Sequence, residues 1–410
     1  MPSELFYKRV KNIVDASSFR EPEKVPVGLD YLNWPYGYAG KTLEQLVNDP
    51  EANAAAYCSF MEEIPFDFTM NPGFYEPYDM FQALGSDNYT LCADRCTVQH
   101  NQAANKFISE EEYDRLIADP DYFINEYFLK RNVPAFQKSR SKAYEMLKNA
   151  AKCVARCVKT TELIADKAIH QYDIVPISRV GLDKKGRNEE EIRLFGSRFP
   201  FFLSSLDSLF DIYRGMMGVF EDLFEMPEIL DQACDAITAY QASQLPPSES
   251  ALESSPLPMG FGLYHVAPYL SPEDYDKYWF QPFKKMMLPY AEAGKKIYIK
   301  GESSFLHTIE RFKEFPKGSV VIQLDSDDPF EAHKKIGGYQ TLATGIRTAM
   351  LSLNDLQNCK DYIKKSFDTF APGGGFLFYQ DKPFLSPSDA DPAKVKEIWE
   401  FANECAEGHY

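Results

Sequence analysis

Short runs of apolar residues recur along the chain, and several of them lack the polar alternation of a half-exposed strand. They lie at residues 24–30, 64–71, 172–180, 258–266, 295–301, 318–325, 339–345 and 374–381. Continuous apolar runs are typical of strands that are buried on both faces of a parallel sheet. The pattern therefore predicts about eight strands, most of them parallel and buried.

Amphipathic stretches separate these runs, and the stretch at 271–294 carries clear helix end signals. Ser271 is suited to cap this helix, Pro272 to its first turn and Gly294 to its end. No Gly-x-Gly-x-x-Gly motif follows the first run, so the alternation favours an α/β fold of the TIM-like (β/α)8 barrel type over a doubly wound sheet. We expect a single domain, 1–410, with an N-terminal helical extension and exposed loops at 180–198 and 241–258.

Charge and cysteine content narrow the classes of function. A formal net charge of −17 over 410 residues disfavours nucleic acid and anionic membrane surfaces as partners. No stretch approaches the roughly 20 apolar residues of a membrane span. We therefore expect a cytoplasmic protein with reduced cysteines. Cys92 with Cys96 and Cys153 with Cys157 have i, i+4 spacing, which fits small buried residues better than a metal site.

The aromatic content of 14% has two interpretations. Phe and Tyr side chains suit a pocket for a planar, apolar substrate. They equally suit an aromatic-rich core, and the sequence leaves both open.

Polar side chains follow many of the predicted strands, where a barrel of this type places its active site. They are Asp30, Asn33, Asn71, Glu76, Arg179, His265, Lys300, Glu302, Asp325, Asp327, Asp328, Gln380, Asp381 and Lys382. Desolvation raises the pKa of a carboxyl group at an apolar barrel mouth, so Glu302 is predicted to donate a proton, although the neighbouring Lys300 acts against that rise.

Structural roles remain open for the same residues. Glu302 can instead cap a helix that begins near Ser304. His265 can be a hydrogen-bonded core histidine. The acidic run 325–328 can be a helix start, where the helix dipole favours acids.

Six stretches carry a resemblance to a known family over nearly the whole chain. They lie at 23–29, 75–85, 206–230, 269–287, 299–337 and 341–378. In their order and spacing they resemble the uroporphyrinogen decarboxylase superfamily, which includes decarboxylases and corrinoid-linked methyltransferases. The resemblance implies a TIM-like barrel with its active site at the C-terminal mouth.

Departures from the family pattern narrow the implied chemistry. Residues 28–40 contain no arginine, whereas the decarboxylases bind substrate carboxylates there with an arginine-containing segment, and Glu76 stands in place of their aspartate. The methyltransferase branch often holds zinc with His-x-Cys and a later cysteine. Tyr298 and Lys300 replace the first two, and the third falls near Lys382.

The resemblance then implies the branch that acts on methyl ethers. Such an enzyme moves a methyl group from a small methoxylated, aromatic substrate to the corrinoid (cobalamin) of a separate carrier protein, and this chain has no Asp-x-His-x-x-Gly motif with which to bind a corrinoid itself. The alternatives are a decarboxylase of a uroporphyrinogen-like or other carboxylated substrate, with Glu76 or Asp325 handling the proton, and a non-catalytic binding protein.

Roles follow for the residues at the strand ends. We expect Glu302, Lys300 and His265 to be catalytic, with an acid or cation stabilising the phenolate that leaves. The residues expected to contact substrate are Asn71, Glu76, Arg179, Tyr298, Asp325 and Gln380. A metal, zinc included, is not required; if one is present, His265, Glu302 and Asp325 are its expected ligands. A homodimer stays open.

Overall fold

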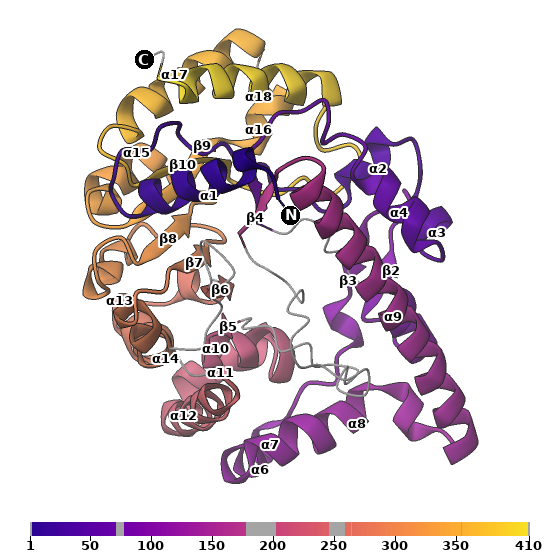
Figure 1. The fold of residues 1–410 in the computed structure, drawn as a ribbon. Coiled ribbons are helices and arrows are strands. Elements are labelled where there is room, and N and C mark those ends of the chain that lie inside the picture. Colours follow the sequence, from indigo (N-terminus) through magenta and orange to yellow (C-terminus); the bar gives the residue numbers. More distant parts are fainter. Residues whose placement is uncertain are drawn as a thin grey trace.

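The computed structural model describes most of the chain. The described residues are 2–70, 78–177, 202–245, 259–263, 265–353 and 355–408. Within them, parallel strands lie inside and helices pack outside, as Figure 1 shows. Among the described helices, none is long and apolar enough to cross a membrane.

Six strands form one parallel sheet in the order β10-β9-β8-β7-β6-β5. Their bounds are β5 (Phe202–Leu203), β6 (Met259–Leu263), β7 (Ile297–Lys300), β8 (Val320–Gln323), β9 (Thr341–Ile346) and β10 (Phe376–Gln380). β1 (Phe68–Thr69) pairs in parallel with β4 (Val175–Pro176). Each of these strands is short and fully or largely buried where its burial is described, as expected for the inside of a parallel α/β fold.

Isolated bridges join the two sheets into one series. Val27 pairs with Phe378 of β10, and Gly28 pairs with Phe68 of β1. All eight predicted runs therefore contain paired residues, and the predicted α/β class with parallel strands is confirmed. No pairing within the described residues joins β4 to β5, so closure of the barrel stays a prediction.

Helices connect and surround the strands. The helices before β4 are α1 (Glu4–Ser17), α2 (Trp34–Tyr38), α3 (Leu43–Leu46), α4 (Pro50–Tyr57), α5 (Tyr78–Ala83), α6 (Tyr113–Ala118), α7 (Pro120–Tyr122), α8 (Leu129–Asn132) and α9 (Arg140–His170). Those after β5 are α10 (Ser205–Ser208), α11 (Met216–Glu225), α12 (Pro227–Gln244), α13 (Pro272–Asp274), α14 (Gln281–Glu292), α15 (Pro329–Ala332), α16 (Thr348–Leu353), α17 (Leu356–Phe370) and α18 (Pro392–Ala406).

Helix α1 is the predicted N-terminal extension, and it covers the end of the sheet where the strands begin. The Ala16 carbonyl accepts a hydrogen bond from the Gly375 amide at 2.7 Å, and the Ser17 carbonyl accepts one from Lys296 Nζ at 2.8 Å. Phe6 and Ile13 of α1 pack in the cluster that fills the space between the strands, with Tyr298 of β7. The opposite end of the strands is left for the active site.

Several local predictions need correction. The predicted loop at 241–258 begins inside α12, which continues to Gln244, while the loop at 180–198 lies outside the described residues. The sequence also missed the antiparallel hairpin of β2 (Tyr89–Leu91) and β3 (Val98–His100), because both strands are short and only partly buried. The predicted helix at 271–294 is confirmed: Ser271 caps α13, and Gly294 adopts a φ of 79° after α14.

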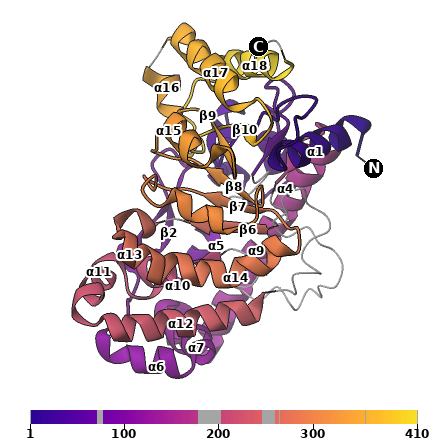
Figure 2. The same ribbon diagram turned by 90° about the vertical axis from the view of Figure 1, so that its left-hand side faces the viewer.

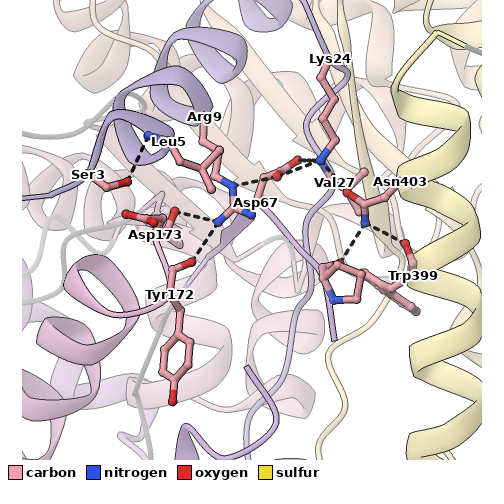
Figure 3. A network of polar contacts seen from close by, with 11 residues as sticks. Ser3, Leu5, Arg9, Lys24, Val27, Asp67, Tyr172, Asp173, Trp399 and Asn403 are labelled. Carbon is pink, nitrogen blue, oxygen red and sulfur yellow. Dashed lines mark hydrogen bonds and ion pairs between the residues drawn. The ribbon is translucent and has the colours of Figure 1, made fainter. Parts of the chain in front are cut away.

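Asp67 joins three parts of the chain at the strand start, as Figure 3 shows. Its carboxylate lies 3.0 Å from Lys24 Nζ and 2.9 Å from Arg9 Nε of α1, and it accepts a hydrogen bond from the Val27 amide at 3.0 Å. Lys24 Nζ also donates to Asn403 of α18. Only 5% of the Asp67 side chain is exposed, so this carboxylate compensates two cations in a place with little water.

Candidate active site

His265 lies between two carboxylates just beyond the end of β6. Its Nδ1 is 2.7 Å from Asp211 Oδ2, and Asp211 belongs to the π-helical segment η6 (Leu209–Tyr213) that continues α10. Its Nε2 forms an ion pair with Glu302, which follows β7. An imidazole that has an acceptor at each nitrogen can satisfy both only when it is protonated at both.

The same contacts set the protonation states. Burial lowers the pKa of His265, but its hydrogen bonds and ion pairs with Asp211 and Glu302 outweigh burial and raise that pKa to about 10. Burial acts to raise the pKa of Glu302, but the hydrogen bond and charge of His265, together with Lys300 and Lys382, lower it below the ordinary value. The predicted rise in the pKa of Glu302 is therefore wrong, and His265 is the group that holds a proton at neutral pH.

Asp207 holds the backbone beside His265 in place. Its carboxylate accepts hydrogen bonds from the Val266 amide at 2.8 Å and from the Trp279 indole at 2.7 Å. Ser204 donates a further bond at 2.8 Å. Burial raises the pKa of Asp207 to about 6. Asp207 precedes Asp211 by one helical turn, so one short segment positions both the ring and the backbone of His265.

Asp211, His265 and Glu302 line an open cavity of about 370 Å³, hereafter called the hollow. Its lining residues are Phe210, Asp211, Met216, His265, Tyr269, Glu302, Ser303, Asp325, Ser326 and Lys382. The volume falls in the range of small-ligand sites. One side of the hollow is aromatic, since the rings of Phe210 and Tyr269 lie 6.4 Å apart and nearly parallel.

Lys300 and Glu302 have separate partners, although they are neighbours at one strand end. Lys300 Nζ lies 3.7 Å from Asp30 Oδ2, while Glu302 meets His265. The predicted helix near Ser304 is not present: the next helical element after β7 is the 3-10 helix η9 (Ile309–Glu314), so Glu302 caps no helix. The Phe305 amide donates to Asp327 at 2.9 Å. The acid and the base thus belong to two charge pairs, and Lys300 acts on Glu302 through its charge alone.

The acidic run 325–328 holds local turns in place. Asp325 accepts a hydrogen bond from the Ser303 amide at 2.6 Å and lies 3.1 Å from Lys382 Nζ. Asp328 caps α15, as the helix-start interpretation predicts. Asp325 and Ser326 are the members of the run that also line the hollow.

Other predicted substrate contacts lie deeper or outside the described residues. Tyr298 is buried and its hydroxyl donates to Gln323 at 2.7 Å. Gln380 is buried and exchanges two hydrogen bonds with the backbone of Asp30. Both have partners inside the fold, and their contact with substrate stays a prediction. The remaining predicted contacts, which lie outside the described residues, are Asn71, Glu76 and Arg179.

Three residues near His265 were missed by sequence reasoning. Asp207 and Asp211 lie one turn apart among apolar residues, a spacing that signals two acids on one buried helix face. His100 of the missed hairpin is also near: burial lowers its pKa, and the charges of Asp211 and His265 act on it in opposite directions.

The predicted metal ligands do not fit one ion. Both nitrogens of His265 meet carboxylates, and Asp325 is paired with Lys382. Among the described residues, no group of three His, Cys, Asp or Glu side chains has the arrangement of a metal site. His265, Glu302 and Asp325 each have a side-chain partner of opposite charge. These pairs stabilise the charge of each group and the proton of His265.

Comparisons with known proteins bear on the fold. No family model matches the chain. No curated protein matches it. Among solved structures it is similar to a methyltransferase from Methanosarcina mazei, with 12% sequence identity and a TM-score of 0.58 over 96% of this chain and 98% of that one. The two chains share a fold. At this identity the likeness concerns architecture, and the resemblance to the uroporphyrinogen decarboxylase superfamily stays a prediction.

The raised pKa of His265 predicts a pH-dependent stability. The protonated ring stabilises the fold fully below its unfolded pKa of about 6.5, and this contribution is lost as the pH rises through about 10. We expect the free energy of unfolding of the native protein to fall by roughly 1–3 kcal/mol more across this window than that of His265→Gln. Urea unfolding at a series of pH values measures both, and parallel curves would contradict the charged state assigned to His265.

Proposed function

We propose that the protein transfers a methyl group from a small methoxylated aromatic compound to the corrinoid of a separate carrier protein. The observation that carries the proposal is a protonated histidine held by two carboxylates beside a partly aromatic hollow. A fold shared with a methyltransferase agrees with it. The reduced corrinoid supplies the nucleophile that takes the methyl group, and every other function falls to side chains of this chain.

His265 is the proton donor in this proposal. Loss of a methyl group from an aryl ether leaves a phenolate, whose conjugate acid has a pKa of about 10, as for tyrosine. With Asp211 and Glu302 in place the pKa of His265 is about 10, so the ring is protonated at neutral pH before the substrate binds. When the ether oxygen takes the place of Glu302 the pKa of His265 falls, which favours transfer of its proton to the leaving oxygen.

In this proposal the substrate replaces Glu302 as the partner of the Nε2 proton of His265. It lines the hollow with 35% of its side chain exposed, and its ion pair occupies the Nε2 proton of His265. An ether oxygen that enters the hollow can share that proton in place of the carboxylate. Asp211, with only 13% of its side chain exposed, holds Nδ1 and keeps the ring oriented.

The aromatic side of the hollow would hold the substrate ring. Phe210 and Tyr269 provide flat apolar surface, and Met216 adds a polarisable thioether. Other large rings such as Trp34, Trp279 and Tyr57 are fully buried, so the aromatic-rich core is confirmed, while the aromatic substrate pocket is part of this proposal.

The test uses a panel of methoxyarenes with a reduced corrinoid protein. Methylation of cobalt changes the corrinoid absorbance, and the demethylated phenol is detected separately by chromatography. We expect both signals with at least one methoxyarene and neither without the carrier. Release of carbon dioxide from a carboxylated compound, with no methylation from any donor, would overturn the proposal in favour of a decarboxylase.

Glu302→Gln tests the pairing with His265. Loss of one of the two carboxylates should lower the pKa of His265 in the free protein, so the fall of kcat/KM at alkaline pH should begin at a lower pH than in the native protein. At neutral pH we expect kcat/KM to fall by less than about tenfold, because Asp211 still pairs with His265 and favours its protonated form. Glu310→Gln removes an acid that is exposed on the 3-10 helix η9 (Ile309–Glu314) and should change neither. An unshifted pH profile in Glu302→Gln would contradict the pairing.

A further inference from the structure

The described cations around the hollow all have carboxylate partners. His265 is shared between Asp211 and Glu302, and Lys382 Nζ lies 3.1 Å from Asp325 Oδ1. Three carboxylates therefore face two cations among the lining residues. The nearby Lys300 is likewise paired, with Asp30. An anionic group on a ligand would have to displace one of these carboxylates or lie within a negative field.

The hydrogen-bonding groups of the hollow also disfavour an anionic ligand group. An ionised carboxylate only accepts hydrogen bonds, whereas a serine hydroxyl donates or accepts. The lining carboxylates stand beside Ser303 and Ser326. Substituents that donate a hydrogen bond without carrying a negative charge thus find acceptors in the lining carboxylates and the serines. A ligand carboxylate can accept only from the two serines and from cations that already have carboxylate partners.

The aromatic side of the hollow restricts the shape of a ligand but not its charge. Phe210 and Tyr269 lie nearly parallel, with an angle of 18° between their planes, and 61% of Tyr269 is exposed. A flat ring can pack on this surface whatever its substituents. Discrimination among substituted rings therefore falls to the charged and polar side.

We propose that the hollow selects methoxylated aromatic compounds with uncharged, hydrogen-bond-donating substituents, such as a phenolic hydroxyl, and discriminates against ring carboxylates. This inference rests on the proposed function and adds a substrate class to it. A phenol, with a pKa of about 10, is neutral at pH 7, whereas an aromatic acid is ionised. At pH 7 the two substituents therefore differ in charge, and the lining carboxylates repel only the ionised one.

The test is a binding measurement on the protein alone. Calorimetric titration at pH 7 compares meta-methoxybenzamide with meta-methoxybenzoate, which have nearly the same shape but differ in charge. We expect the amide to bind about tenfold more tightly or better, and meta-methoxyphenol to bind as well as the amide. Equal or tighter binding of the benzoate would overturn the inference.

Two variants connect the discrimination to the hollow. Asp325→Asn removes the partner of Lys382 and should narrow the difference between amide and benzoate. Asp368→Asn removes the same charge from α17, which lies on the opposite side of the molecule from α10 and α11 in Figures 1 and 2, and should leave the difference unchanged. If Asp325→Asn does not fold, the comparison in the native protein still decides.

Failure of this inference is distinguishable from failure of the proposed function. Methyl transfer from methoxyarenes together with tight binding of the benzoate would reject only the charge selection. No binding of any of the three compounds would reject both.

Discussion

Replacement of His265 by glutamine is expected to lower kcat for methyl transfer by about 10²- to 10⁴-fold, the usual range for loss of a positioned general acid. Glutamine keeps a polar group between Asp211 and Glu302 but has no proton to give to a leaving phenolate. KM should change much less, because the aromatic side of the hollow remains. Steady-state kinetics with the carrier protein measures both constants.

The leaving group of the substrate separates acid catalysis from a structural role. A methoxyarene with electron-withdrawing substituents yields a phenolate of low pKa, which leaves without much help from a proton donor. We therefore expect the defect of His265→Gln to be smallest with such substrates. An equal loss of kcat with every substrate would indicate that His265 only maintains the structure.

A second histidine provides the control. His170 lies at the end of α9, with 42% of its side chain exposed and a weak contact to Asp166. His170→Gln should leave kcat, KM and the pH profile unchanged. A comparable loss in both variants would show that the effect is not specific to the hollow.

Replacement of Asp67 by asparagine is expected to lower the free energy of unfolding by about 3 kcal/mol, since loss of one member of a buried ion pair leaves the other charge uncompensated. Here two cations lose their partner: the Arg9 and Lys24 side chains are only 16% and 21% exposed. Urea denaturation measures the change through its midpoint. The folded fraction should keep its kcat, because Asp67 lies at the opposite end of the strands from the hollow.

The surface pair beside it is a matched control. Glu23 pairs with Lys8 of α1, with 67% and 48% of the two side chains exposed. Exposed pairs contribute less than about 1 kcal/mol, so Glu23→Gln should hardly move the midpoint. A similar small effect of Asp67→Asn would show that its network does not stabilise the fold.

Much of the fold could be predicted because a strand that is buried on both faces consists mainly of apolar residues, which form a recognisable short run in the sequence. All four residues of β8 are buried, and the first three, Val320 to Ile322, are consecutive apolar side chains that a short window of the sequence shows. The hairpin of β2 and β3 has no such apolar run, since its residues are half-buried or exposed. β5, a strand of two residues, was also missed.

The candidate site was predicted in part. His265 and Glu302 were recognised as polar residues at strand ends, and the structure brings them together. The predicted proton donor was Glu302, whereas the structure lowers its pKa and raises that of His265. The sequence shows which residues are neighbours along the chain, but the pKa depends on neighbours in space. Lys300 is adjacent to Glu302 in sequence but pairs with Asp30.

Apolar runs, helix end signals and strand-end polar residues are properties of short segments, so the amino-acid sequence sufficed for the α/β class, the N-terminal helix and the location of His265 near a strand end. Which carboxylates meet His265 depended on the packing of η6 and the residue after β7 against it, and Asp211 is 54 residues away along the chain. Asp211, His265 and Glu302 follow β5, β6 and β7, which are neighbours in the sheet, so the folded sheet brings them together. The tertiary structure thus decided that the proton of the site is held by His265 between Asp211 and Glu302.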